Sequence, residues 1–211
     1  MRSITKLICG GLLATAVSSA LAADGQAIYQ KGGSNPGAIA CITCHGPEGM
    51  GMDAGGFPHI SGYPAEYLNK QIHDFRSGTR QNPIMLPIAN GLTDEEALAV
   101  SQYIASMKSP KTPEVTRAKK PEGEGETLAL RGDWTRNIPE CVVCHGPGGV
   151  GVGTSFPPLA GQHPSYLKNQ LHAWKNGTRK NDHADLMGHI ARALTESEID
   201  AIAQYFSGLG K

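Results

Sequence analysis

The sequence has no net charge, and it is poor in both charged and aromatic side chains. Its 211 residues contain 19 lysines and arginines against 19 aspartates and glutamates. A protein that binds nucleic acid through its phosphates usually carries a basic excess, so this balance argues against such a partner. Hydrophobic residues make up 39% of the chain and charged residues 18%. These values argue against both a protein with many membrane spans and a charge-driven disordered chain.

The first 22 residues are typical of a secretory signal peptide. Two basic residues precede a largely apolar stretch, which ends in the small-residue cleavage site Ala20-Leu21-Ala22. Only 17 uncharged residues separate Lys6 from Asp24, fewer than the ~20 apolar residues of a membrane span. We therefore predict cleavage and export to the periplasm, with a retained membrane anchor as the alternative. Cleavage would remove Cys9, which leaves four of the five cysteines.

The remaining sequence contains an internal repeat. The segment Cys41-Ile-Thr-Cys-His45-Gly-Pro47 recurs as Cys141-Val-Val-Cys-His145-Gly-Pro147. Matching Phe-Pro, Tyr-Leu, Gly-Thr-Arg and Met segments follow in the same order, with a three-residue insertion in the second copy. So many matches in one order indicate two homologous domains.

We divide the chain at the repeat boundaries. After the signal peptide at 1–22, domain 1 spans 23–108 and domain 2 spans 127–211. The stretch 109–126 has three prolines, four basic and four acidic residues, and almost no large apolar side chain. This composition is typical of a linker, and its reach permits the two domains to sit face to face.

Both domains are predicted to be all-α, because no stretch alternates in the manner of a strand. Capping boxes at Thr93 and Thr195 begin the last helix of each domain. Before it we expect a short helix ahead of the first cysteine and a longer helix that runs from a proline to a glycine. These expected helices span 25–31 and 126–131, and 64–78 and 164–177.

The two C-x-x-C-H segments have three chemical interpretations: zinc binding, a redox dithiol, or covalent attachment of haem. Structural zinc gathers both cysteine pairs within one short domain, whereas these pairs are 97 residues apart in separate repeats. A thioredoxin-like dithiol is expected beside a β-α-β pattern, which the sequence does not show. A local disulfide with an incidental histidine leaves the duplication unexplained. We therefore predict two covalently attached haem c groups, each with its iron.

Haem attachment accounts for the spacing of the motif. On a helical turn, Cys41 and Cys44 at i and i+3 face the same way, while His45 presents its imidazole to the iron. A domain of under 100 residues buries little of its own surface, and the low aromatic content of 6% fits a core that a cofactor completes. The second domain offers the same three functions at Cys141, Cys144 and His145.

Methionine is the predicted second axial ligand of each iron. Met187 lies 42 residues after His145, and Met85 lies 40 residues after the histidine of its own domain. Histidine and methionine together close the iron and raise its reduction potential, whereas an open sixth position would allow substrate chemistry. His183 and His189 flank Met187, so bis-histidine ligation is an alternative for domain 2.

As a set, these motifs resemble the di-haem cytochromes c of the c-four class. The resemblance covers the mature chain and rests on the paired C-x-x-C-H-G-P segments, the Phe-Pro loops, the Gly-Thr-Arg turns and the spaced methionines. It implies two tandem class-I cytochrome c domains with their haems close together. It also implies that the carbonyls of Pro58 and Pro157 accept the Nδ1 proton of the two haem histidines.

The arginines of the two Gly-Thr-Arg turns have two interpretations. Arg80 and Arg179 either pair with haem propionates or are solvated surface cations. The remaining histidines, among them His59 and His163, are assigned to the surface or the core.

The resemblance implies an electron carrier and not an enzyme. We predict transfer from a quinol-oxidising cytochrome bc complex to a terminal oxidase or similar acceptor, with these redox proteins as partners. The first alternative is a haem subunit of a larger dehydrogenase, for example flavocytochrome c sulfide dehydrogenase. The second is a di-haem peroxidase, which needs an iron that opens its sixth position. Peripheral membrane association is left open.

Overall fold

The computed structural model describes residues 23–109 and 120–210. In these ranges the chain is helical, and paired extended backbone occurs only as isolated bridges. The all-α prediction is therefore confirmed. The predicted signal peptide and much of the predicted linker lie outside the described residues. Within the described ranges, no helix has the length and the apolar character needed to cross a membrane.

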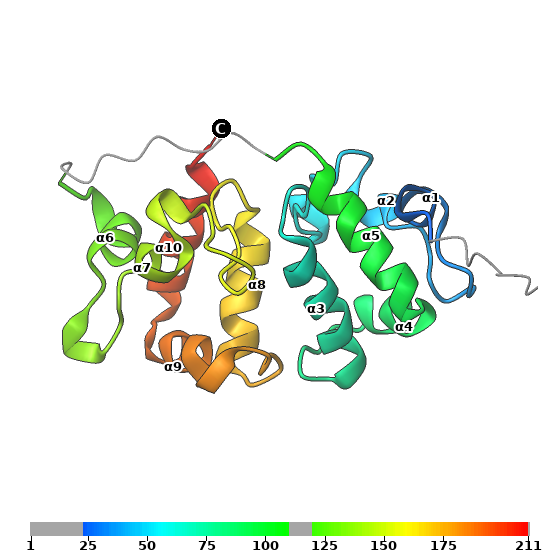
Figure 1. The fold of residues 1–211 in the computed structure, drawn as a ribbon. Helices are drawn as coiled ribbons and strands as arrows, with labels where there is room; N and C mark the ends of the chain where they lie inside the picture. The colour runs from blue at the N-terminus through cyan, green and yellow to red at the C-terminus, as the bar shows by residue number, and fades with distance from the viewer. Residues whose placement is uncertain (1–22, 110–119, 211) are drawn as a thin grey trace, which may run out of the picture.

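The two domains lie side by side and repeat one order of helices (Figure 1). Domain 1 contains α1 Gly25–Lys31, α2 Ile42–His45, η1 Asp53–Gly55, α3 Ala65–Ser77, α4 Met85–Gly91 and α5 Asp94–Ser106. Domain 2 contains α6 Gly123–Arg131, η2 Trp134–Arg136, α7 Cys141–His145, η3 Pro147–Gly149, α8 Pro164–Lys175, η4 His183–Asp185, α9 Leu186–Ala193 and α10 Glu196–Gly208.

The first and last helices of each domain cross at very short range. A Cβ atom at Gly25 would lie 2.1 Å from the carbonyl oxygen of Ala99, and one at Gly125 would lie 2.1 Å from that of Ala201. Only glycine permits this approach of α1 to α5 and of α6 to α10. Helix α6 begins at Gly123, earlier than predicted. Its glycines lower the helix propensity of the sequence, but the helix crossing requires one of them.

The local signals for helix ends are confirmed. Thr93 and Thr195 each accept a hydrogen bond from the backbone of the glutamate three residues later, whose carboxylate accepts one in return. Gly78 takes a left-handed φ of 74° directly after α3, and Gly177 takes 71° just beyond α8. Helices α4 and α9 are not predicted from the sequence, because a turn or two of helix is too short to show a reliable period.

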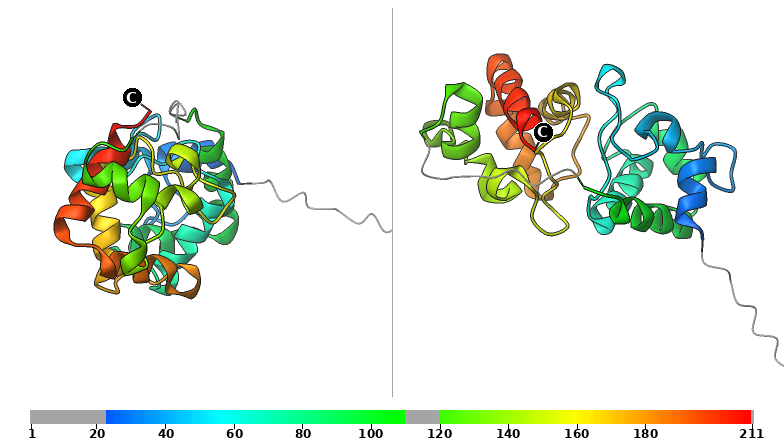
Figure 2. Two further views of the ribbon diagram at one scale, coloured as in Figure 1. Left: turned by 90° about the vertical axis from the view of Figure 1, so that its left-hand side faces the viewer. Right: turned by 90° about the horizontal axis from the view of Figure 1, so that it is seen from above.

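The domains meet along α3 and α8, which lie next to each other in both Figure 1 and Figure 2. Beyond the ends of these helices, Arg80 and Arg179 form an antiparallel bridge between the domains. The Gln81 amide donates to the Thr178 carbonyl at 2.9 Å, and the Lys180 amide donates to the Thr79 carbonyl at 2.7 Å. The repeated Gly-Thr-Arg turns therefore pair with each other across the boundary.

Candidate functional site

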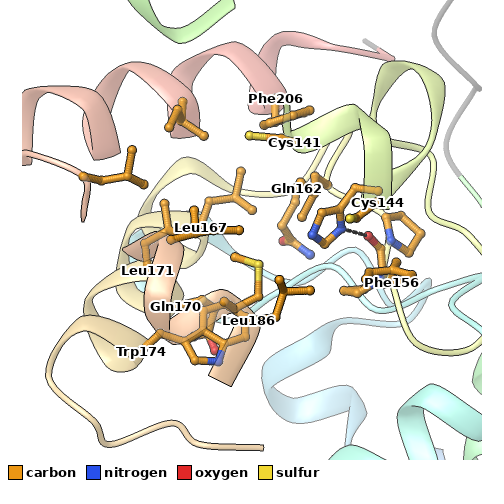
Figure 3. Close-up of a pocket in the computed structure, with 18 of the residues that line it drawn as sticks. Cys141, Cys144, Phe156, Gln162, Leu167, Gln170, Leu171, Trp174, Leu186 and Phe206 are labelled. Atoms are coloured by element: carbon orange, nitrogen blue, oxygen red, sulfur yellow. Dashed lines mark hydrogen bonds between the residues drawn. The ribbon is translucent and has the colours of Figure 1, made fainter. Parts of the chain in front are cut away.

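Each domain contains a cavity with a predominantly apolar lining, and each cavity gathers the predicted haem-binding residues of its domain. In Figure 3 the side chains of Cys141 and Cys144 and those of Leu167, Leu171 and Phe206 surround the cavity of domain 2. The predicted attachment and ligand residues that line this cavity are Cys141, Cys144, His145 and Met187. Those that line the cavity of domain 1 are Cys41, Cys44, His45 and Met85.

The two predicted histidine ligands are held in one orientation and one protonation state. Nδ1 of His45 lies 3.0 Å from the Pro58 carbonyl oxygen, and Nδ1 of His145 lies 2.8 Å from that of Pro157. Because a carbonyl only accepts, Nδ1 carries the proton and Nε2 keeps its lone pair. Burial lowers the pKa of both histidines. Each imidazole is therefore neutral and suited to bind iron through Nε2.

The cysteines fit thioether bonds better than a thiolate metal site. Burial raises the pKa of Cys41 to about 11 and that of Cys141 to about 12, so both side chains are neutral thiols in this apolar setting. Across residues 23–109 and 120–210, no three His, Cys, Asp or Glu side chains gather into a metal site. None of the four cysteines in these ranges is in a disulfide. Uncharged thioethers in an apolar cavity are compatible with covalent haem.

The two methionines are partly buried and are placed by polar side chains just before them. Asn82 accepts a hydrogen bond from the Met85 amide at 2.8 Å, and Asp182 accepts one from the Met187 amide at 2.7 Å. The three-residue insertion lies in this second loop and forms η4 His183–Asp185. The side chains of His183 and His189 are exposed, while that of Met187 lines the cavity. The geometry therefore favours methionine over bis-histidine ligation.

The two arginines are buried, so their interpretation as solvated surface cations is wrong. Arg80 is 7% exposed and Arg179 is 5% exposed. Their guanidinium groups lie over aromatic rings, 4.6 Å from the Phe75 centroid and 3.9 Å from the Trp174 centroid. In the described part of the chain, no carboxylate lies within ion-pair distance of either arginine.

Two adjacent buried cations are costly unless an anion lies close to them, and Asp74 acts on Arg80 only from beyond ion-pair distance. Burial, together with the positive charge of Arg80, lowers the pKa of Arg179. Both arginines line the cavity of domain 1, and Arg179 also lines that of domain 2. The propionate groups of haem are carboxylates, so the positive charge of the two arginines beside the cavities also fits that cofactor.

Each cavity is completed by the other domain, which the sequence does not predict. Tyr63 and Tyr67 line the cavity of domain 2, while Tyr166 and Gln170 line that of domain 1. The hydroxyl of Tyr166 accepts a hydrogen bond from Arg80 at 2.7 Å. The domain boundary is thus part of both sites.

Gln162 is a second interface residue that the sequence does not predict. Gln162 is 1% exposed. Its side-chain amide satisfies both backbone groups of His59, donating to the carbonyl at 2.7 Å and accepting from the amide at 3.0 Å. It also donates to the Tyr63 hydroxyl at 2.9 Å. Nε2 of His163 forms a hydrogen bond with the Met50 carbonyl oxygen at 2.8 Å. His59 and His163 therefore belong to the domain interface.

The cytochrome c family matches residues 22–108 and 125–210, and the chain belongs to this family. Two such domains, each with a C-x-x-C-H segment, define a di-haem electron carrier with two covalently attached haem c groups.

Several known proteins are similar to this chain over most of its length. The chain is 55% identical over 211 residues to a thiosulfate dehydrogenase electron acceptor from Stutzerimonas stutzeri, with 100% of this chain and 98% of that protein covered. It also matches the structure of a thiosulfate dehydrogenase (TsdBA) from Marichromatium purpuratum, with a TM-score of 0.78 and 41% identity over 88% of this chain and 39% of that one. Reduced cytochrome c4 from Pseudomonas stutzeri matches with a TM-score of 0.70 and 31% identity over 80% of this chain and 93% of that one.

Proposed function

We propose that this di-haem cytochrome accepts electrons from a thiosulfate dehydrogenase. The observation that carries the proposal is the 55% identity, over essentially the full length of both chains, with an electron acceptor of that enzyme. The alternative of a haem subunit of a dehydrogenase is thus better supported than a carrier between a cytochrome bc complex and an oxidase. The enzyme that these relatives indicate acts on thiosulfate, not on sulfide.

The Marichromatium match supports a lasting contact between acceptor and enzyme. In that protein, the region similar to this chain makes up 39% of a single thiosulfate dehydrogenase polypeptide. Electron transfer between two parts of one polypeptide needs no free diffusion of the acceptor. A separate acceptor chain would obtain the same benefit from a stable complex. The predicted signal peptide would bring the chain to its partner in the periplasm.

The residues of each cavity have distinct tasks in this function. The cysteine pairs would attach the two haem groups, which would supply one-electron chemistry. His45 and Met85 bind the iron of domain 1, and His145 and Met187 bind that of domain 2. The Pro58 and Pro157 carbonyls fix the histidines. Because the chain would supply both iron ligands of each centre, little of the chain would have to move when an electron arrives.

Arg80 and Arg179 neutralise the haem propionates. Buried cations next to a redox centre favour the form with the extra electron, so both arginines raise the reduction potential of the centres they face. Because Arg179 lines both cavities, it acts on both centres.

The test mixes the purified oxidised holoprotein with a thiosulfate dehydrogenase and thiosulfate, and follows haem reduction by visible absorbance. We expect full reduction that requires both the enzyme and thiosulfate, with two electrons taken up per chain. The controls omit one component at a time. No reduction by the dehydrogenase, together with rapid reduction by a quinol-oxidising cytochrome bc complex, would overturn the proposal in favour of the respiratory carrier.

A further inference from the structure

We propose that the mouth of the domain 1 cavity is the surface on which the thiosulfate dehydrogenase docks. This inference rests on the proposed function and adds to it the domain that receives the electrons. It is carried by a chemical difference between the mouths of the two cavities, which the shared fold places at equivalent positions.

The domain 1 mouth is formed by two stretches that contain no charged side chain. Residues 32–47 and 81–93 include no Asp, Glu, Lys or Arg. The stretches pack on each other, since a Cβ atom at Gly37 would lie 3.4 Å from the carbonyl oxygen of Pro87. Three large apolar side chains are exposed there: Ile39 at 49%, Ile84 at 48% and Leu86 at 40%.

Two of these side chains belong to the cavity itself. Ile39 and Ile84 line the cavity that holds the cysteines and Met85, and both are half exposed, so they lie at its opening to solvent. We call Ile39, Ile84 and Leu86 the apolar rim. Large apolar side chains that are exposed beside a cavity opening are a feature of interaction sites.

The equivalent stretches of domain 2 also expose apolar side chains, Trp134 at 65% and Val143 at 60%, but unlike those of domain 1 they carry charges of both signs. Glu140 lines its cavity at the position that Ala40 has in domain 1. Leu186, at 41% exposure, corresponds to Ile84, but its neighbour Asp185 forms an ion pair with Arg192. The other charged residues of the two stretches, 132–147 and 180–195, are Asp133, Arg136, Lys180 and Asp182.

This difference decides which mouth suits a lasting partner. Interfaces of permanent complexes are more apolar than those of transient ones, and charged rims mainly steer diffusional encounters and are screened by salt. The apolar rim of domain 1 has no charged side chain that could steer an approaching partner, but covering it with a partner is energetically favourable. The Marichromatium match supports a lasting contact with the dehydrogenase, so the occupant we assign to the rim is the surface of that enzyme around its electron-donating centre.

The test compares two matched substitutions in the holoprotein, Ile84→Glu in domain 1 and Leu186→Glu in domain 2. Each places a carboxylate on a half-exposed residue directly before the predicted methionine ligand. Affinity for the thiosulfate dehydrogenase is measured by calorimetry, together with the rate of haem reduction by enzyme and thiosulfate. Because Ile84 adjoins Met85, Ile39→Glu serves as a second rim variant, and the visible spectrum and redox titration of each variant check that ligation is intact.

We expect Ile84→Glu and Ile39→Glu to weaken binding by about tenfold or more, the loss that corresponds to 1.4 kcal/mol, and Leu186→Glu to change it by less than about twofold. Wild-type affinity should change little between low and high salt. If the wild type binds and is reduced but the rim variants match it, or if Leu186→Glu alone weakens binding, the docking surface is wrong while the proposed function stands. If the enzyme does not reduce the wild type, the proposed function itself fails. A wild-type dimer in sedimentation that Ile84→Glu dissociates would assign the rim to a second copy of the chain and overturn the inference.

Discussion

Arg80 and Arg179 lie opposite each other across the domain boundary and share both of their glutamine acceptors. The Gln71 oxygen accepts from Arg80 at 2.9 Å and from Arg179 at 3.2 Å. The Gln170 oxygen accepts from Arg80 at 2.9 Å and from Arg179 at 2.7 Å. Because each glutamine belongs to a different domain, each arginine is held by both domains at once. The same polar side chains thus line the cavities and hold the two domains together.

This arrangement predicts that the two arginines differ in which reduction potentials they affect. Arg179→Gln should lower both reduction potentials, since Arg179 lines both cavities, whereas Arg80→Gln should act mainly on domain 1. The expected shifts are tens of millivolts, because a tenfold change in a one-electron equilibrium corresponds to about 59 mV. An optical redox titration resolves the two centres. Equal shifts of both reduction potentials in both variants would contradict this prediction.

Replacing a methionine should open one iron and leave the other closed. We expect Met187→Ala to allow CO to bind the reduced centre of domain 2 and to lower its potential by on the order of 0.1 V, part of the ~0.8 V range that axial ligands span. Met85→Ala is the matched variant for domain 1. CO binding by the unsubstituted protein, or an unchanged titration of the variants, would rule out methionine ligation at the centre concerned.

Removal of Gln162 should loosen the two domains from each other. Gln162→Ala leaves the buried amide and carbonyl of His59 without their partners, and each unsatisfied buried group costs about 1–3 kcal/mol. We expect a lower free energy of unfolding and a denaturation curve that separates into two transitions. Tyr63→Phe, which removes one hydroxyl between Gln162 and the Pro158 carbonyl, should have a smaller effect. A single, unshifted transition for Gln162→Ala would show that this contact does not couple the domains.

The stability of domain 2 should depend on pH through Glu198. Its hydrogen-bonded ion pair with Arg136 lowers the pKa of Glu198 to about 2 from its usual value of 4.5. A lowered pKa means that the ionised form is favoured in the fold, so the stabilisation is complete above about pH 4.5 and is lost as the pH falls toward 2. Glu198→Gln should cost about 1.5–3 kcal/mol at pH 7, typical of a hydrogen bond to a charged group.

Unfolding titrations of the wild type and of Glu198→Gln at several pH values check this prediction, and the difference should narrow below about pH 4.5. Glu96→Gln is the comparison, because Glu96 closes the equivalent capping box but has no ion-pair partner in the described part of the chain. Burial raises the pKa of Glu96, but hydrogen bonds from Thr93 and Ser34 outweigh it and leave that pKa lowered. The pH dependence of Glu198→Gln should therefore exceed that of Glu96→Gln. A difference between Glu198→Gln and the wild type that is constant with pH would exclude the ion pair as the cause.

Local sequence signals predicted much of the helical structure. Capping boxes such as that at Thr93 and glycines such as Gly78 act within a few residues of themselves, so their effect can be seen in the sequence. Helix α6 was harder to place, because Gly125 disfavours a helix locally and is required only by the approach of Ala201 from the other end of the domain.

The sequence by itself determined the chemistry of the two centres. The duplicated C-x-x-C-H segments indicated two haem c groups, because the spacing of attachment points along a helical turn is a local property. The equivalent positions of Met85 and Met187 predicted the second ligands, and the structure brings both to the cavities. These features need no knowledge of how distant segments meet.

Only the tertiary structure decided how the two centres are joined and where partners can approach. The burial of Arg80 and Arg179, their shared glutamines and the role of Gln162 all depend on the contact between the two domains, which links residues about one hundred positions apart. No local pattern encodes which side chains will be covered by another domain. For the same reason, the uncharged stretches around Ile39 and Ile84 became one apolar rim only when the fold placed both at the opening of one cavity.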